Sequence, residues 1–379
     1  MIIPRVLMIA RGIYPVAVGG VEIHIDSIAK ILCKQLPLTI LAEGETDHHF
    51  NYDVIFSTKK LRHTGLLNLA KAVVFGVIKT LKLKKKYNLI HAQTASIPLL
   101  TGFIVSLVSN TPLIVSCHAS EIRTRGMNSS LKYLQKIFLC RARAVLATTN
   151  EIARILREAY GLTKKPIIII PNGFDEELLS VQNSYESCNK ITCVGSLRFE
   201  KDPFNMAGAL SLVKKSRDGI VVEWIGNGPL RVHLEKYLIS HELQSDFILL
   251  GQLCHEDALM HIQNSDLFVI PSQQEGLPTV LLESMALARP IISTNVGGIP
   301  EIIQNRINGI LVDSGNSVEL ANAILELTES RELREFLGTN ARKRIEAFSW
   351  NRIASKYLSI YYDIINQGRV RRRANRILM

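Results

Sequence analysis

Short runs of β-branched and other apolar residues alternate with helical stretches, and this alternation constrains the fold more than any other feature. In the first half, the runs occupy 5–10, 38–43, 88–93, 113–118, 144–149 and 167–172. One of the intervening stretches has the three-and-four spacing of an amphipathic helix, at Leu66, Leu69, Val73, Val77 and Leu81. Apolar strands separated by helices are typical of a parallel sheet covered on both faces.

The alternation stops at a polar stretch and then restarts. Runs of the same kind occur at 190–196, 220–226, 247–251, 267–272, 290–295 and 309–313. We therefore predict two Rossmann-like βα domains, at 1–175 and 190–350, with a linker at 176–189 and a helical end at 351–379. Ligands of open α/β sheets bind at the carboxyl ends of the strands, so we expect a ligand in a cleft between the domains.

Composition indicates a globular protein with ordinary cores. Apolar residues make up 47% of the 379 residues, and the six cysteines are scattered without a C-x-x-C pair. This spacing favours reduced thiols over a zinc site or a disulfide framework. Arg5 and Arg11 interrupt the apolar N-terminus, and the apolar stretch 96–109 is too short to cross a bilayer. We expect a cytoplasmic protein.

The net charge is +11 and is concentrated in places. One basic cluster contains Lys82, Lys84, Lys85 and Lys86, and a second contains Arg369, Arg371, Arg372, Arg373 and Arg376. Together with the apolar stripe of 66–81, they predict peripheral contact with an anionic membrane surface. The alternative is a stripe that belongs to the core and a frayed tail. The chain has no nucleic-acid-binding motif and only 6% aromatic residues, so we expect no nucleic-acid partner.

The strongest local signal lies in 267–303, where a strand ending at Pro271 precedes Glu275 and a helix that contains Glu283. Eight positions are about two helical turns, so we expect both carboxylates on one face. Carboxylates there can accept hydrogen bonds from the vicinal hydroxyls of a sugar or a ribose. The N–H groups near Thr279 and Val280 open this helix, and a helix start favours phosphate. The alternative is a capping acid and a solvent-facing glutamate.

Three further segments carry candidate binding residues. Arg198 and Lys201 follow the first strand of the second half and can neutralise a diphosphate, or can form a basic surface turn. Gly19 and Gly20 permit a tight turn and a close backbone approach to an anion. His118 ends a strand of the first domain.

These segments resemble glycosyltransferase family 4, the large retaining family with the GT-B fold. The similarity rests on E-G-L-P-T-V-L-L-E followed by A-R-P-I-I-S-T-N-V-G-G-I-P-E, and it extends from 14–24 to 348–358. The fold it implies has two Rossmann-like domains around a cleft and a C-terminal helix that crosses back to the N-terminal domain.

The resemblance also implies roles for single residues. Glu275 contacts the donor sugar near the reacting centre, Glu283 binds the ribose hydroxyls, and His118 lies against the donor sugar. Lys201 contacts the donor phosphates. The family's arginine position is Ser196 here, so Arg198 is the substitute.

On the acceptor side, the resemblance places Gly20 near the phosphates or the acceptor. Glu22 and His24 would face the acceptor. Gly226 and Gly228 resemble a glycine loop near the nucleotide, and a tight strand-to-helix turn explains them equally well. Ala119 and Glu121 replace the glycine and aspartate that usually follow the family's histidine.

The implied activity is transfer of a hexose from a UDP- or GDP-linked donor to a hydroxyl of a glycan or lipid-linked acceptor, with retention of anomeric configuration. Envelope polysaccharide or glycolipid synthesis is the expected setting. No Asp-x-Asp occurs, so we expect neither a metal nor another cofactor. The alternatives are a nucleotide-sugar 2-epimerase of the same fold, a basic nucleic-acid-binding protein, and a dehydrogenase. The last lacks support because the first βα turn has no G-x-G-x-x-G.

Overall fold

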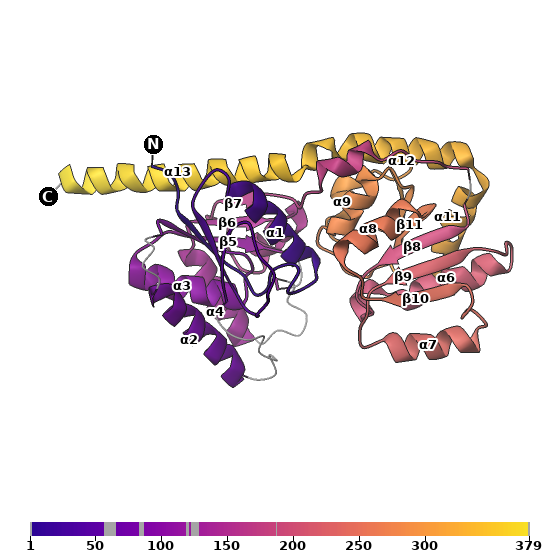
Figure 1. Cartoon of the computed structure of the whole chain (residues 1–379), viewed down its shortest axis with the longest axis horizontal. Coiled ribbons are helices and arrows are strands. Elements are labelled where there is room, and N and C mark those ends of the chain that lie inside the picture. The colour runs from indigo at the N-terminus through magenta and orange to yellow at the C-terminus, as the bar shows by residue number, and fades with distance from the viewer. Residues whose placement is uncertain are drawn as a thin grey trace. The chain divides into compact units, whose positions relative to one another are not determined.

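The computed structural model describes residues 2–56, 66–82, 87–118, 121–122, 129–186 and 188–377; the side chains of 66–69, 129–131 and 367–377 lie outside the description. The chain divides into two compact units (Figure 1). Unit 1 comprises Met1–Pro171 and Trp350–Met379, and unit 2 comprises Asn172–Ser349. Every helix within the described ranges is too short or too polar to span a membrane.

Unit 1 is built on a parallel sheet with the strand order β3-β2-β1-β4-β5-β6-β7. The strands are β1 (Val6–Ile9), β2 (Leu38–Ala42), β3 (Asp53–Phe56), β4 (Leu89–Ala92), β5 (Leu113–Cys117), β6 (Ala144–Ala147) and β7 (Ile167–Ile169). The sequence pattern missed only β3, a half-exposed edge strand. The order reverses direction between β1 and β4, which is where α/β sheets open a crevice for ligands.

Helices cover both faces of this sheet. One core contains residues of α1 (Gly20–Leu32) and α13 (Trp350–Ile377), which pack against each other. The predicted return of the C-terminal helix to the N-terminal domain is confirmed. The other core contains residues of α2 (Leu66–Lys82), α3 (Ile97–Ser109), α4 (Ser129–Arg141) and α5 (Asn150–Glu158).

Unit 2 is also built on a parallel sheet, with the strand order β10-β9-β8-β11-β12-β13. Its strands are β8 (Lys190–Val194), β9 (Val221–Ile225), β10 (Phe247–Gly251), β11 (Leu267–Ile270), β12 (Ile291–Thr294) and β13 (Ile310–Val312). Its helices are α6 (Pro203–Lys214), α7 (Arg231–Ser240), α8 (His255–Gln263), α9 (Thr279–Ala286), α10 (Ile299–Ile302), α11 (Ser317–Glu329) and α12 (Arg331–Ile345), with short 3-10 turns η1 (Glu176–Ser180), η2 (Phe199–Lys201) and η3 (Glu346–Phe348). The two predicted parallel sheets are confirmed.

Candidate functional site

Glu275 is held in the loop between β11 and α9. Its side chain is buried, and Oε1 accepts hydrogen bonds from Ser272 Oγ at 2.7 Å and from Lys201 Nζ at 2.6 Å. The Ser272 carbonyl in turn accepts from Thr294 Oγ1 at 2.6 Å. Neighbouring strand ends therefore fix the carboxylate, and the sequence-predicted pair Lys201 and Glu275 lies together as an ion pair.

The expectation that Glu275 and Glu283 share a helix face is wrong. Helix α9 begins only at Thr279, four positions after Glu275. Pro278 has an extended backbone and precedes the helix, so the chain before it forms a loop rather than a turn of helix. The two carboxylates consequently have separate partners.

Glu283 is 2% exposed and pairs with a histidine that the sequence did not single out. His255 Nε2 donates to Glu283 Oε1 at 2.7 Å. The other carboxylate oxygen, Oε2, is buried without a hydrogen-bond partner among the described protein atoms, as is Thr279 Oγ1. Buried polar atoms in folded proteins are nearly always hydrogen-bonded, so this pair of acceptors marks a place for a ligand that donates hydrogen bonds.

The start of α9 has no side-chain cap. Its first turn contains Thr279 and Val280, and it contains no acidic residue that would repel an anion. The loop before it is tied to the β12–α10 connection by a hydrogen bond from the Gly298 N–H to the Gly276 carbonyl. Uncapped N–H groups at a helix start provide partial positive charge for a phosphate.

The loop that carries Lys201 is supported by two glycines. Leu197 N–H donates to the Asn227 carbonyl at 3.1 Å, which ties the β8 loop to the β9 loop. A Cβ added at Gly228 would lie 2.4 Å from the Leu197 carbonyl oxygen, and one at Gly226 would lie 2.1 Å from the Gly195 carbonyl oxygen. These glycines are therefore required for the close crossing of two loops.

Arg198 and Lys201 differ in their surroundings. Lys201 packs over Gly195, where an added Cβ would lie 3.2 Å from its stem, and its ammonium is directed to Glu275. Arg198 is exposed, and its side chain makes no hydrogen bond or ion pair within the described part of unit 2. Its side chain is thus available to an anion but is not positioned in advance.

In unit 1, His118 is buried at the end of β5. Its backbone N–H donates to Glu121 Oε1 at 2.7 Å, so the glutamate that replaces the family's aspartate hydrogen-bonds the backbone just after β5. Burial lowers the pKa of His118, while the carboxylates of Glu121 and Glu22 oppose that shift. The ring atom Nε2 has no hydrogen-bond partner in the residues described. His118 therefore presents a neutral imidazole with one unused nitrogen.

The expectation that His24 faces the acceptor is wrong. His24 is 1% exposed and is enclosed by α13: Nε2 hydrogen-bonds Tyr357 Oη at 3.1 Å, and the ring lies edge-on to Trp350 at 5.2 Å. It also lies edge-on to His118 at 5.5 Å. Helix α13 packs over the side of α1 that carries His24, so His24 supports His118 from behind.

Glu22 and Gly20 lie at the start of α1. Glu22 is half-buried and folds back over Gly19, three positions earlier, since a Cβ on Gly19 would lie 2.5 Å from Glu22 Oε2. Gly20 is exposed and is the first residue of the helix, which has no side-chain cap. Gly20 is therefore open to solvent at the helix start, with Glu22 two positions further along α1.

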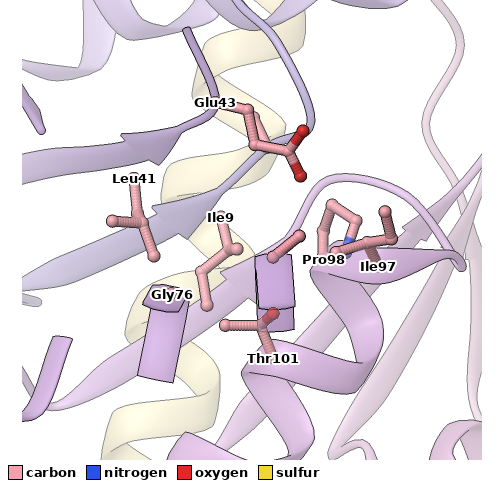
Figure 2. Close-up of a pocket in the computed structure, with 9 residues that line it drawn as sticks. Ile9, Leu41, Glu43, Gly76, Ile97, Pro98 and Thr101 are labelled. Atoms are coloured by element: carbon pink, nitrogen blue, oxygen red, sulfur yellow. The ribbon is translucent and has the colours of Figure 1, made fainter. Parts of the chain in front are cut away.

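A small hollow lies at the carboxyl ends of β1 and β2 (Figure 2). Its volume is about 10 Å³, and it is lined by Ile9, Leu41, Ile97 and Pro98, among others. The Glu43 carboxylate projects into it beside Ile97 and Pro98. The hollow has an apolar floor and one acidic group at its rim.

Two family profiles match consecutive parts of the chain. One described as Glycosyltransferase Family 4 matches residues 18–178, and one described as Glycosyl transferases group 1 matches residues 174–344. The chain belongs to glycosyltransferase family 4. Together the two profiles cover every candidate site residue and every strand of the two sheets except β1.

Relatives of this glycosyltransferase align over most of its length. An uncharacterized glycosyltransferase of Methanocaldococcus jannaschii is 27% identical over 96% of the chain and 99% of its own. The UDP-Gal:α-D-GlcNAc-diphosphoundecaprenol α-1,3-galactosyltransferase of Escherichia coli is 26% identical over 80% of the chain and 82% of its own.

The fold agrees with solved structures of the GT-B type. The Anabaena protein HepE, solved in complex with UDP and glucose, matches with a TM-score of 0.80 at 19% identity and covers 94% of this chain and 99% of its own. The predicted GT-B fold is confirmed.

Several residues of the glycosyltransferase site were not predicted from the sequence. His255 opens α8 after a short loop, and Ser272 and Thr294 support Glu275 from strand ends. His255 and Thr294 act through residues 28 and 22 positions away, and a local motif cannot show such contacts, whereas Ser272 lies only three positions before Glu275. The position of His255 just after β10, at the sheet edge where Glu275 lies, was the one available signal.

Proposed function

We propose that this glycosyltransferase transfers a hexose from a UDP-linked donor to a hydroxyl of a lipid-linked acceptor, with retention of anomeric configuration. The observation that carries the proposal is the buried, unpartnered Oε2 of Glu283 beside the uncapped start of α9. The hydroxyls of a ribose can donate hydrogen bonds to Glu283 Oε2. A diphosphate can accept hydrogen bonds from the N–H groups at the start of α9. The E. coli relative, named for a UDP-Gal donor and a diphosphoundecaprenol acceptor, supports the choice of substrates.

In this proposal, unit 2 binds the donor from end to end. Glu283, oriented by His255, accepts the ribose hydroxyls. The N–H groups of Thr279 and Val280 and the side chains of Lys201 and Arg198 hold the diphosphate. Glu275 accepts hydroxyls of the hexose, because Ser272 and Lys201 fix its position.

The reaction breaks the bond between the sugar C1 and the diphosphate oxygen. Negative charge grows on the departing UDP, and the Lys201 ammonium together with the α9 start stabilises that charge. The acceptor hydroxyl attacks C1 from the side that the diphosphate leaves, and its proton passes to a diphosphate oxygen. Glu275 stabilises positive charge on the sugar ring and forms no bond to it. His118 contributes a neutral imidazole that hydrogen-bonds the donor sugar.

Transfer from a panel of radiolabelled nucleotide sugars to lipid extracts tests the proposal, with and without excess EDTA. We expect a UDP-sugar to be used in EDTA, the product to keep the donor's anomeric configuration, and Glu275→Gln to reduce kcat by about 100-fold or more, as loss of one positioned electrostatic group does elsewhere. Glu235→Gln, an exposed helix position, is the matched control. Isomerisation of the donor sugar without an acceptor, or activity that requires added metal, would contradict it.

A further inference from the structure

Charge is distributed very unevenly along the chain. Residues 54–150 contain 15 of the 45 lysines and arginines but only one of the 34 acidic residues, which gives this segment a net charge of +14 and the remainder a net charge of −3. The single acid is Glu121, whose carboxylate accepts a hydrogen bond from the His118 N–H. The excess positive charge of the protein thus belongs to one part of unit 1.

Three helices of this segment lie side by side on one face of the unit 1 sheet. Helix α2 packs against α3, and α3 packs against α4 (Figure 1). None of the three contains an aspartate or glutamate. Lys71, Lys79 and Lys82 are exposed on α2, and α4 ends in the exposed Arg141. The outer surface of these helices is therefore positive without interruption by acids.

The same surface exposes large apolar side chains. On α2, Val74, Phe75 and Ile78 are 53%, 48% and 42% exposed. Val108 of α3 and Tyr133 of α4 are 64% and 65% exposed. Scattered exposed apolar residues are ordinary, but a run over three adjacent helices that also carries lysines is typical of an interfacial surface.

The apolar stripe predicted from the sequence is mostly not this surface, although its last member, Leu81, is 48% exposed. Val73 is buried and Val77 packs against the core beneath α2, while the side chains of Leu66 and Leu69 lie outside the described residues. The three-and-four spacing identified the inner face of the helix. Lys84, Lys85 and Lys86 are outside the description, as are the tail side chains from Arg369 to Arg376, so the inference rests on α2, α3 and α4.

We propose that the outer face of α2, α3 and α4 docks on a membrane surface that contains anionic lipids. Lysines attract the headgroups, and the apolar side chains enter the boundary between headgroups and acyl chains. A second copy of the chain would bring an equally positive face, which like charges oppose. A nucleic acid would not bury Val74, Ile78 or Val108. The inference deepens the proposed function, since a lipid-linked acceptor is presented at such a surface.

Co-sedimentation with vesicles tests this docking without donor or acceptor. We expect the protein to pellet with vesicles of phosphatidylglycerol and phosphatidylcholine, and to pellet less at high salt. We expect it not to bind vesicles of pure phosphatidylcholine. The variant Lys71→Gln/Lys79→Gln/Lys82→Gln should bind at least about tenfold more weakly. Phe75→Ser/Ile78→Ser should lose a similar factor that salt does not remove.

Matched variants in unit 2 serve as controls. Lys215→Gln/Lys236→Gln/Lys343→Gln removes three exposed lysines, and Val232→Ser/Ile239→Ser removes two apolar side chains from the surface of α7. Both should bind vesicles like the wild type, and urea unfolding transitions like those of the wild type, followed by circular dichroism, would show that all variants fold. Equal binding by the α2 variants and their controls, or tighter binding to an oligonucleotide than to vesicles, would overturn the inference. Vesicle binding without sugar transfer would instead contradict the proposed function.

Discussion

Lys201 and Glu275 form a 2.6 Å ion pair, and we assign the two members to adjacent parts of one donor. Lys201 is about one-quarter exposed, while Glu275 is nearly inaccessible. A bound diphosphate would therefore compete for the ammonium, which can move, while Ser272 keeps the carboxylate in place. The pair thus keeps both side chains oriented before the donor arrives.

Replacing Lys201 tests the phosphate contact. Lys201→Ala should weaken binding of UDP, and of pyrophosphate alone, by roughly tenfold to 100-fold, because a charge-assisted hydrogen bond contributes about 1.5–3 kcal/mol. Titration calorimetry measures both ligands, and Lys215→Ala at the end of α6 is the control. Unchanged affinity for pyrophosphate would remove Lys201 from the phosphate site.

Replacing Glu283 should weaken the binding of UDP but not the binding of pyrophosphate. Glu283→Gln replaces the acceptor Oε2 that lacks a protein partner, so affinity for UDP should fall by about tenfold or more. Affinity for pyrophosphate should stay the same, because pyrophosphate has no ribose. The same calorimetric titrations make the comparison, and an equal loss for both ligands would show that Glu283 acts on the fold of the loop instead.

Among the connecting elements, the crossing of the β8 and β9 loops decides where Lys201 lies. Gly228→Ala would force its Cβ against the Leu197 carbonyl, and such overpacking costs about 2–3 kcal/mol. Gly219→Ala is the control: the space around Gly219 is open and only its φ of 82° opposes a side chain, at a cost of about 1 kcal/mol. Urea unfolding and UDP titration should both rank Gly228→Ala as the more damaging change.

The sequence predicted the helices and strands well, but it predicted the contacts between them poorly. Apolar runs predicted twelve strands that the structure contains, because a parallel strand buried on both faces needs an unbroken run. Strand β3 was not predicted, because Asp53 and its half-exposed neighbours lie at a sheet edge and do not form an unbroken apolar run. Periodicity could not show that α9 starts after Glu275, because Pro278 determines where that helix begins. Nor could it show that His24 faces inward, because the packing of α13 determines that.

The two units should respond differently to acid. His91 in unit 1 is buried between Tyr361 and Ser116, and burial, with the nearby His118, lowers its pKa from 6.5 to about 3. The unfolded chain therefore binds more protons than the folded one between those values, and unit 1 loses stability as the pH falls from 6.5 toward 3. Between about pH 7.5 and 5, the loss from His91 is about 2 kcal/mol.

Each unit contains one of the two tryptophans, which allows separate measurement. Trp350 reports on unit 1 in a Trp224→Phe protein, and Trp224 reports on unit 2 in a Trp350→Phe protein. Urea unfolding at the two pH values should show the loss in the Trp350 signal, and His91→Gln should reduce it by about 2 kcal/mol. If the Trp350 and Trp224 signals show the same loss of stability between the two pH values, His91 is not the source of that loss.

Unit 1 is made from both ends of the chain, whereas unit 2 is one continuous segment between them. A ribosome releases residues in order, so the seven strands of the unit 1 sheet emerge first, but the face that α13 covers has no cover until the last segment appears. Unit 2 can complete its core before that moment. During synthesis, therefore, unit 1 is left with His24, His91 and the apolar residues of that face exposed until α13 is made, and this interval is when a chaperone would have most to bind.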